Sequence, residues 1–544
     1  MIQLNKNNKL IVGLAAIIFS IIILLAIYYI FFSGTEEVLD EPEIIVQTDD
    51  RISPNENQAL ILEILRIRNR DLIDIIMNSG NGWENKPNMY FITEMDELEY
   101  ISKNVGSASR GITETFIKEW DSIFKENKIV RDAEEEQEIS YVTLKLMQRK
   151  NSGLFGRQTN DIELANIYLI YDYKTGRWSG DDYFNDTDGY GHYINNKVEV
   201  WFNLYQTDFD HDGIPYWTEV NILHTNPEVD DTQNDPDGDG IPTDWEWKWG
   251  YDPFVYDNHT TLDPDQDGIE NNEEYFMQKW FSNPYCQDIY LEVDGMESGG
   301  FLDPPHILYK ESQQIIIERF AEHGINVYID DGWPEGPVNK GGELLTHYER
   351  MSQDSGMMLQ YYRNHFADER KGIFRYVVMC HRGGFCHPAT FNNYDQMAVG
   401  ISNQQMIAAK GAFTPRTYRL MAAVSVMHEL GHSLGIGPWN VGGNDNFTFA
   451  EGRAAKQEFL DEWGNYKSVM NYYYIYDKTL VDYSDGSHGT GDFNDWEFFD
   501  LTFFQYESKV VEDPGFELPG VEEISFMETV YEHLPLYTGF RLGL

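Results

Sequence analysis

Residues 414–437 read TPRTYRLMAAVSVMHELGHSLGIG, and the spacing of their apolar side chains predicts a buried helix. Thr414 stands where a helix N-cap belongs, and Pro415 occupies the first helical position, where its missing N–H is not needed. The apolar residues that recur at helical spacing are Leu420, Met421, Val424, Met427, Leu430 and Leu434. The helix is expected to end near Gly435.

Residues 428–432 of this helix read HELGH. Residues four apart share one face of a helix, so His428 and His432 can face the same metal ion, while Glu429 lies about 100° away and can reach a water held there. Neutral imidazole suits zinc, and zinc lowers the pKa of a bound water toward ~7, so that a nearby carboxylate can take its proton. We therefore predict one catalytic zinc with Glu429 as general base. The alternative is two solvent-facing histidines on an ordinary helix.

HELGHSLGIG and a later stretch, SVMNY at residues 468–472, together resemble the metzincin metallopeptidases. In that family a glycine three residues after the second histidine breaks the active-site helix, and Gly435 stands there. The resemblance implies that Met470 is the Met-turn residue beneath the zinc, and that Tyr472 reaches the metal or the transition-state oxyanion. It extends loosely over residues 286–544 and implies a metalloendopeptidase domain with a twisted mixed sheet and an active-site helix. Without the resemblance, Met470 would be interpreted as an ordinary core residue.

The sequence departs from the metzincin pattern at the third zinc ligand. The pattern HExxHxxGxxH/D places that ligand at position 438, where this chain has Pro438, which has no donor atom to offer. The loop PWNVGGNDN that follows contains Asp445 after two glycines that would let the chain turn back, so we predict Asp445 as the third ligand. The sequence leaves open Glu451, Asn440 and His488, or a thermolysin-like scheme with Glu451, Glu458 or Glu462.

Apolar runs upstream of the helix predict the rest of this domain as a sheet with helices. The expected elements are a buried strand over 288–294, a helix over 306–324, strands over 325–329 and 373–380, and an edge strand over 397–402.

Three segments of one pattern precede this domain and form an internal repeat: DFDHDGIPYWTE from Asp208, DPDGDGIPTDWE from Asp235 and DPDQDGIENNEE from Asp263. Acids at positions one, three and five, glycine at six and glutamate at twelve form the spacing of an EF-type calcium loop. The predicted calcium ligands are Asp208, Asp210, Asp212, Glu219, Asp235, Asp237, Asp239, Glu246, Asp263, Asp265, Asp267 and Glu274. The alternative is a solvated acidic linker.

Residues 206–285 resemble thrombospondin type 3 repeats more than EF-hands, because long flanking helices are missing. The resemblance implies a calcium-ordered, rather rigid module that binds several structural calcium ions and is not catalytic.

Residues 58–205 predict a small α+β domain of unknown role, which we interpret as a spacer or pro-like domain. Helices are expected over 60–76 and 113–124, and strands over 141–147 and 166–173, the latter followed by a turn at 174–176 toward Trp178. Residues 34–57 are polar and acidic, which indicates a linker.

The N-terminal segment predicts a membrane anchor. Residues 10–32 carry no charge and are long enough to span a ~30 Å hydrocarbon core. Lysines precede this span and acidic residues follow it, so the positive-inside rule places residues 1–33 as a cytoplasmic tip with a single-pass signal anchor, and the bulk of the chain outside the cell. The alternative is a cleaved export signal with a secreted product.

The net charge of -51 over 544 residues argues against a nucleic-acid partner and favours a protein, a peptide or a cation. With three cysteines the chain is no disulfide scaffold, although Cys380 and Cys386 lie close enough in sequence to bridge in an oxidising compartment. The function expected is a membrane-anchored, extracellular zinc endopeptidase. The alternative is a calcium-dependent surface adhesion protein with an inactive peptidase fold. Pro438 favours this alternative, and the intact Glu429 argues against it.

Overall fold

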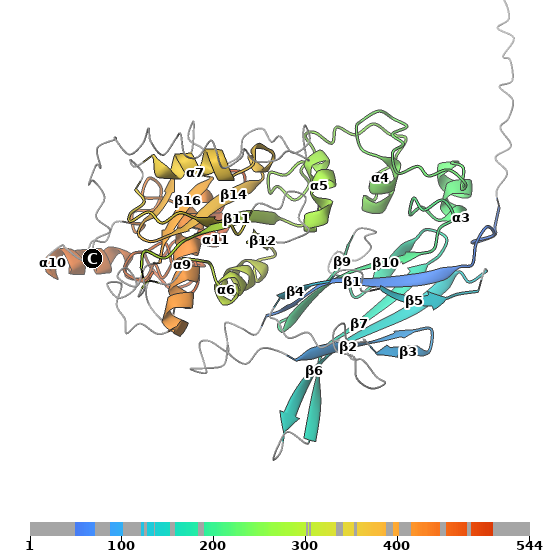
Figure 1. Cartoon of the computed structure of the whole chain (residues 1–544), viewed down its shortest axis with the longest axis horizontal. Helices are drawn as coiled ribbons and strands as arrows, with labels where there is room; N and C mark the ends of the chain where they lie inside the picture. The colour runs from blue at the N-terminus through green and yellow to red at the C-terminus, as the bar shows by residue number, and fades with distance from the viewer. Residues whose placement is uncertain are drawn as a thin grey trace, which may run out of the picture.

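The structure, a computed structural model, describes residues 49–503 apart from internal stretches, and Figure 1 draws the described residues in colour. The internal stretches outside the described residues are 71–87, 102–120, 125–127, 135, 153–157, 183–189, 301–302, 304–305, 333–340, 353–355, 388–394, 402–414, 446–452 and 476–479. The described chain is a mixed α+β protein with three sheets, one of them mixed and largely parallel. An α+β fold class with a mixed sheet is what the sequence predicted.

The first two sheets form a β-sandwich with antiparallel pairing throughout. One has the order β4-β1-β10-β9 with β5 also paired to β1, and the other has the order β3-β2-β6-β7-β8. Both contribute buried side chains to one apolar core. The strands are β1 (Ala59–Asn69), β2 (Met89–Met95), β3 (Leu98–Ile101), β4 (Asp121–Ile123), β5 (Lys128–Asp132), β6 (Ile139–Ser152), β7 (Gln158–Asp172), β8 (Arg177–Gly180), β9 (Gly191–Ile194) and β10 (Val198–Gln206).

The helix predicted over 60–76 is wrong, because β1 occupies residues 59–69. Leu60, Leu62 and Ile64 are fully buried and alternate with partly exposed neighbours, which is the period of a strand. The run LILEILRI fits both periods in sequence, and pairing with β10 decides between them. Of the second predicted helix only 121–124 are described, and β4 lies there. Within the described residues this domain contains strands alone, so its predicted α+β composition is not found there.

The predicted strands over 141–147 and 166–173 are confirmed as parts of β6 and β7. The turn that follows is also confirmed, since Gly176 has a φ of 71° and donates its N–H to the carbonyl of Asp172. A side chain is strained at positive φ, so this turn into β8 favours glycine.

The segment between the sandwich and the third sheet consists of loops and short helices. These are α3 (Tyr216–Thr218), η3 (Glu219–Leu223), α4 (Thr243–Trp249), α5 (Asn271–Met277) and η4 (Gln278–Trp280). Each of the three acidic repeats supplies one loop, and a short helix follows it (Figure 1).

The third sheet has the order β12-β11-β14-β16-β15, with β13 also paired to β11. Its strands are parallel except for β15, which runs antiparallel to β16. The elements of this part are β11 (Asp288–Met296), α6 (Lys310–Ala321), β12 (Asn326–Asp330), β13 (Leu344–Leu345), α7 (Met357–His365), η6 (Asp368–Arg370), β14 (Phe374–Cys380), β15 (Gly384–His387), β16 (Gln396–Gly400), α9 (Pro415–Ser433), α10 (Arg453–Trp463) and α11 (Asp495–Phe498).

Four strand and helix predictions in this part are confirmed, namely β11, α6, β12 and β14. The strand predicted at 397–402 also exists as β16, but it is not an edge strand, because it pairs with β14 on one side and β15 on the other. The short strand β15 lies at that edge of the sheet, and its four residues gave no separable signal in the sequence.

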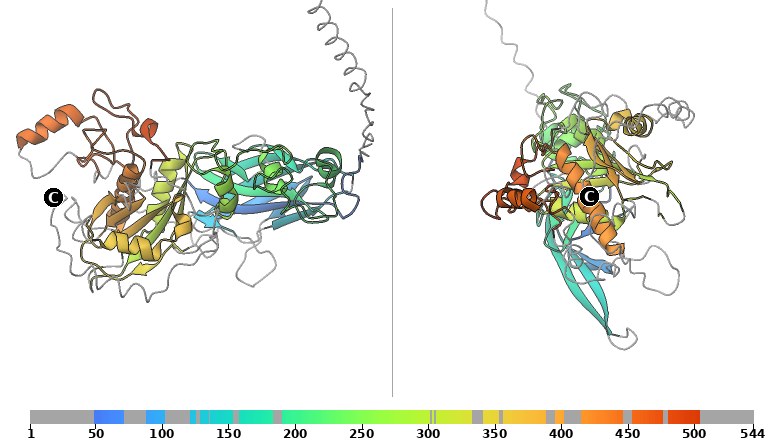
Figure 2. Two further views of the ribbon diagram at one scale, coloured as in Figure 1. Left: turned by 90° about the horizontal axis from the view of Figure 1, so that it is seen from above. Right: turned by 90° about the vertical axis from the view of Figure 1, so that its left-hand side faces the viewer.

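Helices cover both faces of the third sheet, as Figures 1 and 2 show. One face packs with α6 and α9 into a core that includes Val377, Val399 and Val426. The other face packs with α7 and with Trp280 from η4 into a second core. Helix α9 is therefore buried against the sheet, as the predicted apolar spacing required, and it runs from Pro415 to Ser433. Thr414, the predicted N-cap, lies outside the described residues.

The predicted membrane span, residues 10–32, also lies outside the described residues, and no helix among those described is long and apolar enough to cross a bilayer. Cys286, Cys380 and Cys386 are buried and free, so the bridge that the sequence left open is not formed.

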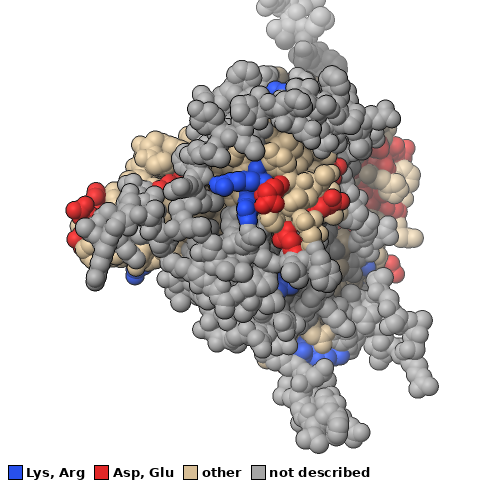
Figure 3. All heavy atoms as spheres, turned by 60° about the vertical axis from the view of Figure 1, so that its left-hand side comes forward, with Lys and Arg blue, Asp and Glu red and all other residues tan. Residues whose placement is uncertain are grey.

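On the face drawn in Figure 3, Lys and Arg side chains gather beside Asp and Glu side chains around uncharged residues.

Candidate functional site

Helix α9 holds both histidines of the HELGH motif in the interior. His428 and His432 are 2% and 8% exposed, and their rings lie nearly perpendicular with centroids 4.9 Å apart. The Nδ1 atom of His428 lies 2.8 Å from the carbonyl oxygen of Val469, and that of His432 lies 2.7 Å from the carbonyl oxygen of Ile436. A carbonyl only accepts, so each Nδ1 carries a proton, and each Nε2 can bind a metal once it has lost its own proton. This is the tautomer that binds a metal through Nε2.

Asp445 completes a group of three donors. Its Oδ1 lies 3.1 Å from His428 Nε2, and its Oδ2 lies 3.3 Å from His432 Nε2. A tetrahedral zinc site with bonds of about 2.0–2.1 Å has ligand atoms about 3.3 Å apart. The spacing of these donors therefore fits a single zinc ion with a fourth position left for water, and the residue predicted as third ligand is the one that the fold brings to the histidines.

The chain returns to the histidines by a tight turn after α9. Gly435 has a φ of 91°, which ends the helix, and Asn440 ties the turn by donating to the carbonyl of Gly435. Asp445 itself has a φ of 50°. The two glycines before it serve close packing, because a Cβ on Gly442 or Gly443 would stand 2.6 or 2.8 Å from the Trp463 ring.

The rival ligands do not join this group. Pro438 and Asn440 are exposed, and Asn440 is engaged in the turn. His488 lies 2.8 Å from Asp492 in a separate cluster. Glu458 and Glu462 are exposed on α10, and Glu451 lies outside the described residues. Among the described residues Asp445 is thus the third donor.

Glu429 lies beside the three donors and is 6% exposed. Burial raises its pKa to about 7, although the two imidazoles act in the opposite direction, and the backbone N–H of Cys386 on β15 donates to it. Its Oε2 atom is buried and receives no hydrogen bond from the described residues. A carboxylate whose pKa lies near neutrality can both accept and return a proton.

His428 and Asp445 each shift the pKa of the other strongly. Burial lowers the pKa of His428, but the charge of Asp445 outweighs it and raises this pKa to about 9. Burial alone would raise the pKa of Asp445, but the two imidazoles outweigh it and lower this pKa far below its ordinary value. Protons and a divalent cation therefore compete for the same lone pairs.

Residues 468–472 lie under and beside the histidines. Met470 is fully buried, and a Cβ on Gly431 would stand 2.3 Å from its sulfur, so the thioether packs directly against α9 between the two histidines. The Tyr472 ring stacks on His428 with centroids 5.3 Å apart and an interplanar angle of 25°. Both residues thus lie beside the histidines, and their roles as Met-turn and as oxyanion donor stay predictions.

Sequence reasoning missed several groups at this site. The carbonyls of Val469 and Ile436 and the amide of Cys386 are backbone atoms, for which a sequence carries no signal. Trp439 is 54% exposed, and its ring centroid lies 6.3 Å from that of His432. The signal in the sequence was that Trp439, an aromatic residue, follows the HELGH motif by only a few residues.

The three acidic loops share one set of backbone contacts. The position-one aspartates Asp208, Asp235 and Asp263 each accept the N–H of the glycine at position six, at 3.0 Å. Those glycines have φ values of 86°, 99° and 89°, which only glycine adopts readily. The position-five aspartates, Asp212, Asp239 and Asp267, each accept the N–H of the buried isoleucine two residues later.

Each loop turns buried carboxylate oxygens inward without a hydrogen bond from the described residues. These atoms include Oδ1 and Oδ2 of Asp210, Oδ2 of Asp237, Oδ2 of Asp265, both carboxylate oxygens of Glu246, and one oxygen each of Glu219 and Glu274. In the first loop the four predicted ligands lie within 4.8 Å of one another. Burial and then the neighbouring Asp212 raise the pKa of Glu219 to about 9. Such clusters of oxygens fit calcium, which takes six to eight of them.

Hydrogen bonds also join each acidic loop to a later segment of the chain. The second oxygen of each position-five aspartate accepts a backbone N–H further on: Asp212 from Asp231, Asp239 from Asp257 and Asp267 from Asp288. Asp288 is the first residue of β11. The third loop is therefore attached directly to the sheet against which α9, with its two histidines, packs.

No family model matches the chain, and no curated protein matches it. Among solved structures, human GIVD cytosolic phospholipase A2 in complex with a methyl gamma-linolenyl fluorophosphonate inhibitor and terbium chloride is 11% identical with a TM-score of 0.17, over 30% of this chain and 18% of that chain. The chain spans 18% of the length of that protein, and a likeness this low carries no argument. The resemblances to metzincins and thrombospondin repeats stay predictions.

Asp445→Asn is expected to weaken zinc binding by at least about 100-fold, because it removes an anionic donor from a site with three protein ligands. Zinc retained after dialysis against graded concentrations of chelator measures this. Asp461→Asn, at an exposed carboxylate of α10, is the control and should behave as wild type. Equal retention by both variants would remove Asp445 from the site.

Glu219→Gln is expected to reduce calcium binding, measured by titration calorimetry, from three equivalents to two. It removes a position-twelve ligand while matching the protonated state that the raised pKa favours without calcium, so the calcium-free melting temperature should not fall. Glu228→Gln, at an exposed acid between the first two loops, is the control. Three equivalents in Glu219→Gln would contradict the loop assignment.

Gly431→Ala is expected to destabilise the protein by about 1–3 kcal/mol, because the new methyl group overlaps the Met470 sulfur. In a Met470→Ala background the same change should cost less, and chemical denaturation of the four proteins of this cycle measures the difference. Gly300→Ala, where a Cβ meets nothing within 4 Å, is the control. A cost that is independent of Met470 would mean that the thioether does not support the helix.

Proposed function

We propose that this protein is a zinc-dependent endopeptidase. The observation that carries the proposal is the convergence of Nε2 of His428, Nε2 of His432 and the carboxylate of Asp445, with Glu429 beside them. A zinc ion held by these three residues supplies Lewis acidity, which activates water and polarises a carbonyl near neutral pH.

The residues of the chain supply the proton transfers. Glu429, with a pKa raised to about 7, takes the proton of the attacking water and returns it to the leaving amine. The amide of Cys386 holds one side of this carboxylate, which leaves Oε2 for the water. Tyr472, stacked on His428, is the side chain proposed to donate a hydrogen bond to the oxyanion.

The neighbouring sheet edge supports a peptide as substrate. β15 pairs only with β16 among the described strands, and it also carries the amide that holds Glu429. An extended peptide can add to such an edge through main-chain hydrogen bonds, which would place its backbone next to Glu429. The exposed ring of Trp439, near His432, offers an apolar contact for a side chain of the substrate.

Asp445 weakens the case for an adhesion protein with an inactive peptidase fold. That alternative depended on Pro438 as a missing ligand, whereas three donors and a buried general base are present together. We further propose that residues 10–32 anchor the chain in the cell membrane with the N-terminus in the cytoplasm, so that calcium outside the cell fills the loops of 206–285 and the peptidase acts on extracellular proteins.

Glu429→Gln is expected to lower turnover of an unfolded protein such as casein by at least about 10²–10⁴-fold, because it removes the general base without removing a donor. The purified full-length chain is assayed with zinc and calcium, and zinc content is measured on the same samples. Glu462→Gln, at an exposed site on α10, should match wild type. Undiminished turnover in Glu429→Gln, or no chelator-sensitive hydrolysis by wild type, contradicts the proposal.

A further inference from the structure

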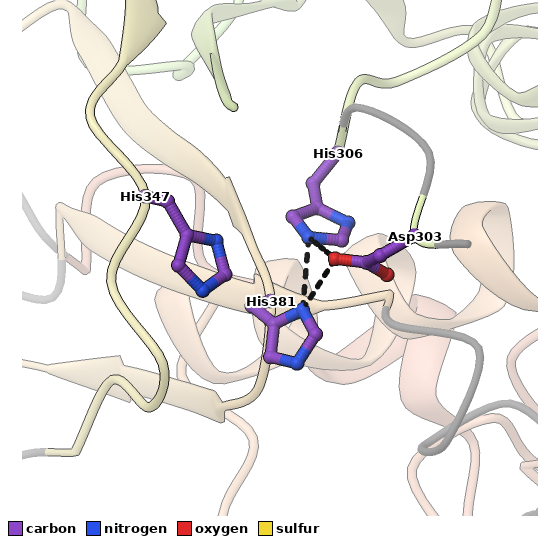
Figure 4. A group of neighbouring side chains, drawn as sticks. All are labelled: Asp303, His306, His347 and His381. Carbon is purple, nitrogen blue, oxygen red and sulfur yellow. Dashed lines mark hydrogen bonds and ion pairs between the residues drawn. The ribbon is translucent and has the colours of Figure 1, made fainter. Parts of the chain in front are cut away.

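A second cluster of metal-ligand side chains lies away from α9, at the carboxyl edge of the third sheet. Figure 4 shows its four members, Asp303, His306, His347 and His381, turned toward a common centre. Asp303 and His306 are three residues apart, but His347 and His381 lie far from them in sequence and the four match no motif, so the sequence carried no signal that would group them.

The parallel strands bring these residues together. His381 directly follows β14, and His347 follows β13 by two residues. His306 exchanges two backbone hydrogen bonds with Met296, the last residue of β11, at 2.8 and 2.9 Å. Because β11, β13 and β14 are mutually parallel, their carboxyl ends meet at one edge, and the three histidines meet there as well.

The donor atoms have the spacing of ligands around one ion. Asp303 Oδ2 lies 3.1 Å from His306 Nε2 and 2.9 Å from His381 Nδ1, and these two nitrogens are 3.1 Å apart. With His347 included, one ligand atom of each residue lies within 4.8 Å of all the others. A tetrahedral zinc ion with bonds of about 2.0–2.1 Å would separate its ligands by about 3.3 Å.

The rings of His306 and His381 face each other in the interior. His306 is fully buried and His381 is 7% exposed, yet their facing nitrogens share one carboxylate oxygen and at most one proton can lie between them. A cation would accept the lone pairs that these rings direct at each other.

Backbone groups hold the other ligands in place. Nδ1 of His347 lies 3.2 Å from the carbonyl oxygen of Glu297, so it carries the proton and leaves Nε2 free to bind a metal. The amide of Gly299 donates to Asp303 Oδ2 at 3.0 Å. A Cβ on Gly299 would stand 2.6 Å from Cε1 and 2.8 Å from Nε2 of His347, so this glycine leaves the room that the cluster needs.

We propose that Asp303, His306, His347 and His381 form a second zinc site, separate from the proposed catalytic one. Three imidazoles and one carboxylate suit zinc, whereas calcium prefers oxygen ligands. Four protein donors fill a tetrahedral shell and leave no position for water, so this zinc is structural. Glu349, a 69% exposed side chain at 3.7 Å from His347 and 3.8 Å from His381, stands outside this shell.

The position of the site indicates what it stabilises. It joins the loop after β11, the loop after β13 and the end of β14, which no disulfide links. The chain continues from His381 into β15, whose Cys386 amide holds Glu429. The second zinc thereby fixes the segment that positions the proposed general base, although the site stands on its own geometry whether or not the protein is a peptidase.

Zinc content of the full-length chain, measured by atomic emission after dialysis with excess calcium, tests the proposal. Wild type is expected to hold two zinc ions per chain, and His347→Ala one. The double variant His428→Ala/His432→Ala is also expected to hold one, and combining all three substitutions should leave none. His224→Ala, at an exposed histidine outside both clusters, is the control and should hold two.

The outcomes separate the two sites. If wild type holds one zinc ion and His428→Ala/His432→Ala keeps it, only the new site binds zinc. If wild type holds one zinc ion and this variant loses it, only the proposed catalytic site binds zinc, and the proposal is overturned. Full zinc content in His347→Ala also overturns it. If His347→Ala does not fold, cobalt titration of metal-stripped wild type decides, because two tetrahedral sites give two saturating absorption steps and one site gives a single step.

Discussion

The burial of two imidazoles on α9 opposite the carboxylate of Asp445 is the constraint on which the chemistry of this protein depends. Bringing these groups out of water is unfavourable unless each polar atom finds a partner. Backbone carbonyls satisfy one nitrogen of each ring, and the carboxylate faces the other. The glycine turn at 435 and the packing of Met470 against Gly431 then follow as requirements of the same geometry, since both allow backbone to approach the helix closely.

The same principle orders the rest of the chain. The acidic loops bury carboxylates whose pKa values are raised by burial and by one another, as for Asp208 and Glu219. Without cations these loops oppose folding, because like charges are held together in a poorly hydrated place. The hydrogen bond from the amide of Asp288 on β11 to the carboxylate of Asp267 connects the last loop to the third sheet. In the account proposed above, calcium and zinc therefore act on one continuous structure.

Much of this was predictable from sequence where the signal is local. The helix α9, the HELGH face and the three loops follow from spacing along a single segment. The run at 60–69 could not be assigned in this way, because its apolar residues fit two periods and only pairing with β10 selects the strand. The approach of Asp445 to the histidines does not follow from spacing along the chain, since it depends on a turn in which Gly442 and Gly443 pack against Trp463. The cluster of Asp303 and three histidines could not be predicted from the sequence, because the order of the strands in the sheet brings its members together.

The central claim is that one zinc ion binds at His428, His432 and Asp445, and a crystal structure phased at the zinc absorption edge tests it most directly. The account predicts an anomalous peak bonded to Nε2 of both histidines and to the Asp445 carboxylate, at about 2.0–2.2 Å. A structure of zinc-saturated protein in which these side chains diverge, or in which the peak near α9 has a different third ligand, would contradict it.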